Sequence, residues 1–177
     1  SVPSFYQVNP DQAEVLYGKA LEIAALTGQE TVLDLYCGIG TISLVLARHA
    51  RQVWGAEVVP QAVADARENA RRNRVDNLRF LCGDAGEAAR RLEADGITPS
   101  VICVDPPRKG LAEDVVDTMV RMSPRRIVYV SCDPGTLGRD VARFCARDYA
   151  ARQAAAVDLF PRTKHVETVV LLEKEAL

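Results

Sequence analysis

The strongest constraint on the fold is an alternation of short β-branched runs with amphipathic stretches of about 10 to 15 residues, which predicts successive βα units around a parallel sheet. Five runs are predicted to be strands: 31–36, 52–57, 78–82, 101–104 and 126–130. The amphipathic stretches are predicted to be helices: 11–26, 41–50, 60–73, 85–94, 113–122 and 135–146. Each predicted strand is therefore followed by a predicted helix.

The end of the chain departs from this alternation. Two further β-like runs, 154–159 and 166–172, are separated by the loop FPRTKH instead of a helix. This spacing predicts a closing antiparallel hairpin. The expected fold is α/β, with a mostly parallel seven-stranded sheet, helices on both faces and a C-terminal antiparallel hairpin. That is the plan of the Rossmann-like class I methyltransferases that use S-adenosylmethionine, and not of a six-stranded dehydrogenase.

Length and hydropathy indicate one domain. The chain has 177 residues, of which 48% are hydrophobic, enough for one well-filled core. We expect a single catalytic domain over 1–177, with 1–28 as a lead-in segment and helix. No apolar run approaches the roughly 20 residues that a membrane span needs, and the chain does not start with a signal sequence. We therefore expect a cytoplasmic protein without a membrane partner.

The cysteines point away from disulfides and metals. They are odd in number and scattered, and no C-x-x-C pair occurs, so neither a disulfide framework nor a zinc site is indicated. Four of them lie within or beside apolar runs and are expected to be structural: Cys37, Cys82, Cys103 and Cys145. Cys132 differs, because it follows a predicted strand and precedes a Pro-Gly turn, where an α/β enzyme presents reactive groups.

The segment VLDLYCGIG carries the first binding motif. Gly38 and Gly40 permit a tight turn between strand and helix, but the third glycine of a dinucleotide site is absent, which favours a nucleoside without phosphate. Glu57 ends the next strand, where a carboxylate can accept both ribose hydroxyls, and Asp84 is placed to accept an adenine amine. Together with Asp34 the set describes S-adenosylmethionine. The alternative is that Glu57 and Asp84 only cap the helices that follow them.

The segment DPPRKGL is the second motif. Asp105 ends the fourth predicted strand, and Pro106 and Pro107 stiffen the loop behind it. Base-amine methyltransferases carry a similar D/N-P-P sequence followed by an aromatic residue that stacks on a flipped base. Here Arg108 takes that place and Lys109 follows, a pair suited to phosphate contact. A plain proline loop with a solvated basic face is the alternative.

The order of seven segments resembles the RNA uracil-5-methyltransferase family, which makes 5-methyluridine in ribosomal or transfer RNA. The segments are FYQVN, DLYCGIG, GAEVV, GDA, DPPRKG, SCDPGTLGRD and FPRTKHVE, and they cover nearly the whole chain. The resemblance implies that Cys132 is the nucleophile, Glu167 the general base and S-adenosylmethionine the cofactor. It implies a cofactor site made of Gln7, Asp34, Tyr36, Gly38, Gly40, Thr41, Glu57, Asp84 and Asp105. It implies substrate contacts by Phe5, Asp105, Arg108, Arg139 and His165.

The implied chemistry explains the residue types. Carbon 5 of uracil is a weak nucleophile until a thiolate adds to carbon 6, and a base must later remove the carbon 5 proton so that the thiol can leave. We expect Arg139 and the start of the following helix to lower the thiol pKa of Cys132, and Asp133 to oppose them. His165 is as well suited to orientation or phosphate contact as to proton transfer. The target base must be taken out of its stack.

The substrate and two alternatives stay open. The expected partner is RNA, ribosomal (23S) before transfer RNA, although a net charge of −2 requires that contact to use local patches. A cytosine-5-methyltransferase uses the same thiol addition, but its cysteine usually follows proline, whereas Cys132 follows Ser131. The second alternative is a cofactor-binding RNA-associated module without turnover. Larger family members carry a β-barrel RNA-binding domain, and some an iron–sulfur segment, so we expect this chain to be a catalytic domain with weakened RNA affinity. Oligomeric state is not indicated.

Overall fold

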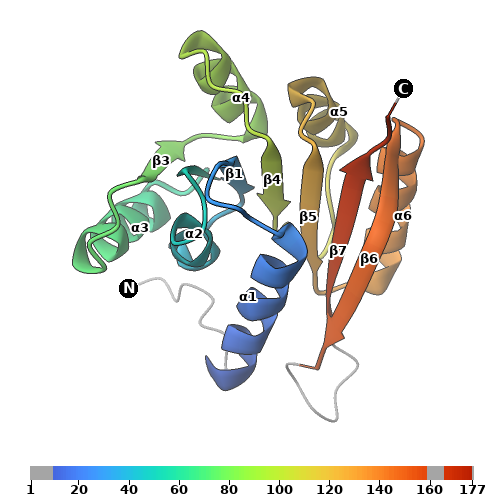
Figure 1. Cartoon of the computed structure of the whole chain (residues 1–177), viewed down its shortest axis with the longest axis horizontal. Coiled ribbons are helices and arrows are strands. Elements are labelled where there is room, and N and C mark those ends of the chain that lie inside the picture. The colour runs from blue at the N-terminus through green and yellow to red at the C-terminus, as the bar shows by residue number, and fades with distance from the viewer. Residues whose placement is uncertain (1–9, 159–165, 177) are drawn as a thin grey trace.

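The computed structural model describes residues 10–158 and 166–176, with side chains from residue 14 onward, and these residues form a seven-stranded sheet between two layers of helices (Figure 1). The helices are α1 (Pro10–Ala24), α2 (Thr41–Ala47), α3 (Pro60–Arg72), α4 (Ala85–Ala94), α5 (Glu113–Met122) and α6 (Pro134–Cys145). The strands are β1 (Thr31–Leu35), β2 (Gln52–Glu57), β3 (Leu78–Cys82), β4 (Val101–Val104), β5 (Arg126–Ser131), β6 (Tyr149–Val157) and β7 (Glu167–Lys174). The predicted fold is confirmed.

The strand order is β3-β2-β1-β4-β5-β7-β6, and β7 runs antiparallel to both of its neighbours. From β1 the chain builds outward through β2 to β3 and then returns to place β4 on the other side of β1. Ligands of such sheets bind outside the carboxyl ends of the strands at this reversal. The loops that follow β1 and β4 are therefore where the topology predicts a site.

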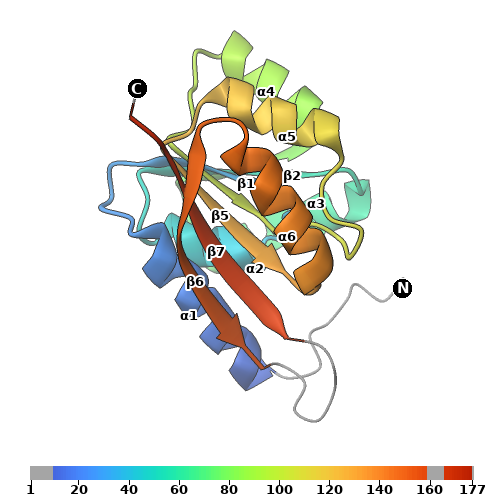
Figure 2. The same cartoon turned by 90° about the vertical axis from the view of Figure 1, so that its right-hand side faces the viewer.

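Hydrophobic clusters on the two faces of the sheet hold the layers together. One cluster joins the sheet to α1, α2 and α3, and the other joins it to α4, α5 and α6. Figure 2 shows α4, α5 and α6 on one side of the sheet and α1 and α2 on the other. Every residue of β1 and β4 is buried, which explains why the sequence of these central strands is almost continuously apolar. None of the helices described is long and apolar enough to cross a membrane.

The edge strand β6 begins earlier than the sequence predicts. It starts at Tyr149 instead of residue 154, and a bulge interrupts its pairing with β7 between Ala151 and Gln153. Most of its side chains are exposed, so no alternation of apolar and polar residues marks its first half. A bulged, exposed edge strand carries little of the periodicity on which a prediction depends.

Two cysteines contradict the expectation that four of them are structural. Cys37 and Cys103 are buried, but Cys82 and Cys145 are exposed. Cys82 ends the edge strand β3, and Cys145 lies in the last turn of α6. A neighbouring apolar run therefore does not ensure burial at the end of an element.

A polar anchor fastens α1 to the sheet. Arg126, the first residue of β5, donates to the carbonyl oxygens of Ala24 and Ala25 at 2.6 and 2.8 Å and to Glu30 at 3.0 Å. Glu30 also accepts hydrogen bonds from the backbone and hydroxyl of Thr27. Burial acts to raise the pKa of Glu30, but these hydrogen bonds outweigh it and the net pKa is lowered. The anchor fixes the end of α1 against β5.

We predict that Glu30→Gln lowers the free energy of unfolding by about 2 kcal/mol near neutral pH, because Arg126 loses its buried counter-charge. The folded pKa of Glu30 lies below its ordinary value of 4.5, so the carboxylate stabilises the fold above that pH and ceases to do so as the pH falls through the folded pKa. Urea unfolding of wild type and variant should therefore converge in acid. Glu22→Gln, which removes only the exposed pair with Lys19, is the control and should change little. An equal loss in both variants would contradict the prediction.

Candidate active site

A tight turn after β1 forms one wall of the site. Tyr36, Gly38 and Gly40 all have positive φ, at 60°, 54° and 81°, and α2 begins directly afterwards. A Cβ atom on Gly40 would lie 2.8 Å from the ring of Phe80, so both the conformation and the space require glycine there. The tight turn that the sequence predicts after β1 is present.

Asp34 lies beneath this turn. It is 1% exposed and accepts a hydrogen bond from the Ser43 hydroxyl, which comes from the first turn of α2. Burial raises the pKa of Asp34 to about 7, against the lowering effect of the Ser43 hydrogen bonds, and the charge of Glu57 raises it further. Asp34 therefore supports the turn from inside. Its direct contact with a cofactor stays a prediction.

Glu57 at the end of β2 supports the same turn from the side. Its carboxylate accepts from the backbone of Gly38 at 3.1 Å and from the backbone of Val59 at 3.0 Å. Val59 precedes α3, so the capping alternative holds in part for Glu57. Each carboxylate oxygen makes one of these bonds and keeps a further lone pair for a hydroxyl donor.

Asp84 caps α4. Its side chain accepts from the backbone of Glu87 at 2.8 Å, and Glu87 accepts from the backbone of Asp84 at 2.9 Å, which is a capping box. Asp84 therefore does cap the helix that follows it, and its contact with an adenine amine stays a prediction. Asp84 nevertheless lines one pocket together with Tyr36 and Glu57, so the fold does bring these three predicted cofactor residues together.

Cys132 and Glu167 lie at the same end of an antiparallel strand pair. Ser131, the last residue of β5, is paired with Thr168 of β7, and Cys132 follows β5 while Glu167 begins β7. The charge of Glu167 acts on the Cys132 thiol. Ser131 shapes the turn, because its hydroxyl donates to the carbonyl oxygen of Asp133 and accepts from the Asp133 backbone. The predicted nucleophile and base are 35 positions apart in the chain, and the pairing of β5 with β7 brings them to the same edge of the sheet.

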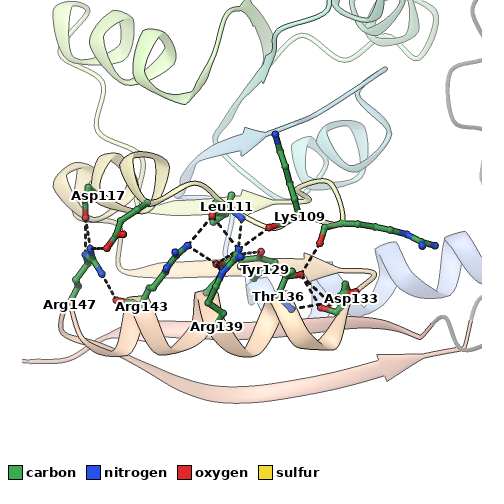
Figure 3. Close-up of polar contacts among 12 residues, drawn as sticks. Lys109, Leu111, Asp117, Tyr129, Asp133, Thr136, Arg139, Arg143 and Arg147 are labelled. Atoms are coloured by element: carbon green, nitrogen blue, oxygen red, sulfur yellow. Dashed lines mark hydrogen bonds and ion pairs between the residues drawn. The ribbon is translucent and has the colours of Figure 1, made fainter.

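The surroundings of the thiol differ from the expectation. Burial raises the pKa of Cys132, the charges of Glu167 and Asp105 add to the increase, and Arg108 supplies the opposing positive charge. Arg139 was expected in that role, but its guanidinium donates to Asp140 and to the carbonyl oxygen of Lys109 (Figure 3). The expectation that Arg139 lowers the thiol pKa is wrong, because its side chain is engaged by Asp140 and by the backbone of the loop between β4 and α5. Its contact with substrate stays a prediction.

Asp133 also behaves differently from the expectation that it opposes thiol ionisation. Its carboxylate accepts from the backbone of Thr136 at 2.9 Å and caps α6. Hydrogen bonds at this cap lower the pKa of Asp133, so its charge is held by the helix terminus. The opposition to ionisation comes instead from Glu167 and Asp105, on other elements.

A cluster of acids lies beside the thiol, with one residue that the sequence did not reveal. Burial raises the pKa of Asp105 to about 7, with Glu167 and Asp34 contributing. Burial also raises the pKa of Glu167, against the charge of Arg108. Tyr17 of α1 responds to all three acids, and its pKa is raised to about 12, first by burial and then by Asp105. On the sequence Tyr17 is one apolar position of an amphipathic helix, so nothing distinguishes it from core.

The remaining predicted residues are placed as follows. Thr41 is the first residue of α2 and is exposed. Phe5, Gln7 and His165 lie outside the described residues. Within 10–158 and 166–176, no three side chains of histidine, cysteine, aspartate or glutamate are grouped so that they could hold a metal ion.

We predict that Asp105→Asn stabilises the fold above neutral pH. Because the folded pKa of Asp105, about 7, lies above its ordinary 3.8, the folded state holds a proton that the unfolded state releases, and stability falls as the pH rises between these values. The variant removes this loss, so its free energy of unfolding should exceed that of wild type by about 1–3 kcal/mol near pH 8 and by little near pH 4. Asp76→Asn, at an exposed position, is the control for urea unfolding. A variant less stable than wild type at the higher pH would contradict this account.

Comparisons with known proteins identify the family. A family model described as tRNA (Uracil-5-)-methyltransferase matches residues 2–175. An uncharacterized RNA methyltransferase of Enterococcus faecalis is 52% identical over 174 residues, which cover 98% of this chain and 38% of that protein. One from Lactiplantibacillus plantarum is 51% identical over 176 residues, covering 99% and 38%. The chain thus spans under two fifths of the length of these relatives.

Solved structures add the fold and one closer neighbour. The tRNA (uracil-54, C5)-methyltransferase of Pyrococcus abyssi, in complex with S-adenosyl-L-homocysteine, superposes with a TM-score of 0.81 at 36% identity, covering 96% of this chain and 40% of that one. The N-methyltransferase NodS from Bradyrhizobium japonicum has a TM-score of 0.72 at 14% identity over 94% and 98%, a likeness of fold alone. The match over nearly the whole chain shows that this protein belongs to the tRNA (uracil-5-)-methyltransferase family of RNA methyltransferases.

Proposed function

We propose that this chain methylates carbon 5 of a uridine in RNA, with S-adenosylmethionine as cofactor, Cys132 as nucleophile and Glu167 as general base. The observation that carries the proposal is the pairing of Ser131 with Thr168, next to which Cys132 follows β5 and Glu167 begins β7 at the carboxyl edge of the sheet. Addition to a pyrimidine ring needs a thiol, and release of the thiol needs a base that acts on the same ring. A thiol directly after β5 and a carboxylate at the start of β7 would meet both needs.

The cofactor would lie over the turn after β1. Gly38, where an added Cβ atom would meet nothing within 4 Å, leaves the backbone open to a ligand. The spare lone pairs of Glu57 suit ribose hydroxyls, and Asp84 suits an adenine amine. Asp34, Tyr36, Thr41 and Asp105, together with Gln7, complete the proposed set. S-adenosylmethionine would supply an electrophilic methyl group there. The solved relative from Pyrococcus abyssi, which holds S-adenosyl-L-homocysteine, supports this choice.

The protein's own residues would carry the remaining steps. The thiolate of Cys132 forms a bond to carbon 6 of the uracil, and the ring electrons make carbon 5 nucleophilic. After carbon 5 is methylated, Glu167 takes the proton from that carbon, the double bond re-forms and Cys132 leaves as thiolate. Arg108, whose charge favours the ionised forms of both Cys132 and Glu167, would stabilise the thiolate before it attacks.

The substrate class is RNA, and two kinds are proposed. The sequence favours ribosomal RNA, whereas the name of the Pyrococcus abyssi relative refers to uracil 54 of tRNA. Phe5, Arg108, Arg139 and His165 are proposed to contact the nucleotide. The cytosine alternative has less support, because Ser131 stands before Cys132 where a cytosine-5-methyltransferase usually has proline. The Ser131 hydroxyl donates to the carbonyl oxygen of Asp133 and accepts from the Asp133 backbone, two bonds that proline could not make. Both RNA classes should therefore be tested as substrates.

The proposal is tested by the release of tritium from RNA labelled at carbon 5 of uridine. Methylation replaces that hydrogen, so wild type should release label from ribosomal or transfer RNA only when S-adenosylmethionine is added. Cys132→Ala should release none, while Cys145→Ala, a control at an exposed cysteine, should match wild type. Release by Cys132→Ala, or none by wild type from either RNA, would contradict the proposal.

Glu167→Gln separates the two halves of the reaction. Without the base the carbon 5 proton stays in place, so tritium release should fall by about 100-fold or more while a covalent complex with RNA accumulates. A denaturing gel should show the complex for Glu167→Gln and none for Glu167→Gln combined with Cys132→Ala. Rapid tritium release by Glu167→Gln would assign the base to another residue.

A further inference from the structure

Asp140 is a fully buried carboxylate that joins three elements around the site. It lies in the middle of α6 and is 0% exposed. One of its oxygens accepts from the hydroxyl of Tyr129 on β5 at 2.7 Å and from the backbone of Leu111 at 2.8 Å. The other accepts from Arg139 at 2.9 Å and from Arg143 at 3.2 Å. Tyr129 is three positions before Cys132, so Asp140 links the strand that leads to the thiol with the helix that follows it.

The loop between β4 and α5, residues 105–112, is held against α6 through its backbone. Arg139 donates to the carbonyl oxygen of Lys109 at 2.9 Å, and Arg143 donates to that of Leu111 at 3.0 Å (Figure 3). Thr136 donates to the carbonyl oxygen of Arg108 at 3.0 Å. The backbone of Leu111 also donates to Asp140. These bonds hold the loop at three successive levels of α6, at Thr136, at Arg139 with Asp140, and at Arg143. We call this set of contacts the α6 clamp.

Gly110 shows how closely the loop and the clamp fit. It has a φ of 72°, and a Cβ atom built on it would lie 2.5 Å from Asp140 and 2.5 Å from Arg139. Any side chain here would push the loop away from the buried carboxylate. The loop thus packs on Asp140 through a backbone conformation and a close contact that only glycine allows without strain.

The clamped loop carries groups that act on the thiol. Asp105 and Arg108 both belong to this loop. Together with Glu167 of β7 they are the charged groups that act on the Cys132 thiol. Asp133, which follows Cys132, instead accepts a hydrogen bond from the backbone of Thr136 at the start of α6. Arg108 is the group that opposes the acids at both Cys132 and Glu167. Its distance from the thiol is therefore set by where the loop lies on α6.

We propose that Asp140 is a positioning residue, which holds the 105–112 loop on α6 so that the Arg108 cation stays beside Cys132 and Glu167. The proposal deepens the function proposed above and rests on it for the roles of Cys132 and Glu167. Asp140 touches neither the thiol nor the base through any contact described. It acts through the backbone of the loop and through its two arginine partners.

The physical basis is that the loop supplies one of the four hydrogen bonds to the buried carboxylate, while the two arginines that bind the carboxylate also bind the loop. Its oxygens receive four hydrogen bonds, two of them from guanidinium groups, which offset the cost of burying a charge. An amide at this position would turn an NH₂ group toward Arg139 and Arg143 or toward Tyr129 and Leu111. Either arrangement breaks contacts and loosens the loop. A displacement of about 1 Å in a reacting group is enough to cost a large factor in rate.

The test is the pH dependence of Cys132 alkylation by iodoacetamide, followed by peptide mass spectrometry so that the other cysteines do not interfere. Asp140→Asn should raise the pH midpoint of alkylation by about one unit, because the thiolate loses the nearby cation. Thr136→Val removes the hydroxyl bond to the carbonyl oxygen of Arg108 and the longer hydroxyl contacts with Asp133, and it keeps the side-chain shape and the backbone bond to Asp133. It should raise the midpoint in the same direction by less. If Asp140→Asn does not fold, the alkylation midpoint of Thr136→Val tests the positioning role instead.

Arg147→Gln is the matched control. Arg147 lies in the turn that follows α6 and pairs with Glu113 and Asp117 of α5, outside the 105–112 loop; Figure 3 shows it beside Asp117. Its replacement removes a contact between this turn and α5, so the midpoint of Cys132 alkylation should stay where it is in wild type. If Asp140→Asn or Thr136→Val lowers only the thermal unfolding temperature and leaves the alkylation midpoint unchanged, Asp140 is a purely structural residue and the proposal fails.

Alkylation needs neither RNA nor cofactor, so this test stands apart from the test of function. A raised midpoint together with no tritium release by wild type would keep the α6 clamp and reject the methylation of uridine. An unchanged midpoint together with normal Cys132-dependent tritium release would keep the function and reject the positioning role of Asp140.

Discussion

The antiparallel pairing of β7 with β5 is the constraint on which the proposed site depends. In the parallel part of the sheet, only residues that follow a strand reach the carboxyl edge, as Asp105 does after β4. Because β7 runs the opposite way, its first residue reaches that edge instead of its last. Glu167 begins β7 and Cys132 follows β5, so the reversal of a single strand brings the proposed base to the same edge as the proposed nucleophile. A sixth parallel strand would have placed Glu167 at the far edge.

The site concentrates groups that are hard to ionise. Burial raises the pKa of Asp34, Asp105, Glu167 and Cys132 alike. Nearby carboxylates raise the pKa of Asp34, Asp105 and Cys132 further. Such a cluster costs folding stability and is kept where chemistry uses it. The opposing charge comes from Arg108, on a loop stiffened by two prolines and seated on α6. The backbone position of that loop therefore bears on the charge that faces the thiol.

Much of the fold could be predicted from the sequence because burial and periodicity coincide in it. The fully buried strands β1 and β4 are almost continuous apolar runs, and their predicted bounds differ from the structure by at most one residue. β6 was the exception, since an exposed and bulged edge strand shows no such pattern. Capping by Asp84 was foreseen as an alternative because acidic residues before helices commonly cap them.

The site was less predictable, because side-chain direction is decided by tertiary contacts. Arg139 follows Cys132 by seven positions and was expected to face it, but the buried charge of Asp140 holds the guanidinium elsewhere. Tyr17 lies on a helix far from the motifs, and only the packing of α1 on the sheet brings it near the acids. Pairing of distant elements, which no local pattern encodes, accounts for both differences.

The central claim is that Cys132 bonds to carbon 6 of a uridine, and the most direct measurement uses RNA that carries 5-fluorouridine. Fluorine replaces the hydrogen that the base must remove, so the reaction should stop at the covalent stage when S-adenosylmethionine is present. Mass spectrometry of the digested complex should find a methylated 5-fluorouridine on the peptide that contains Cys132. An adduct on another cysteine, or bound cofactor without any adduct, would contradict the account.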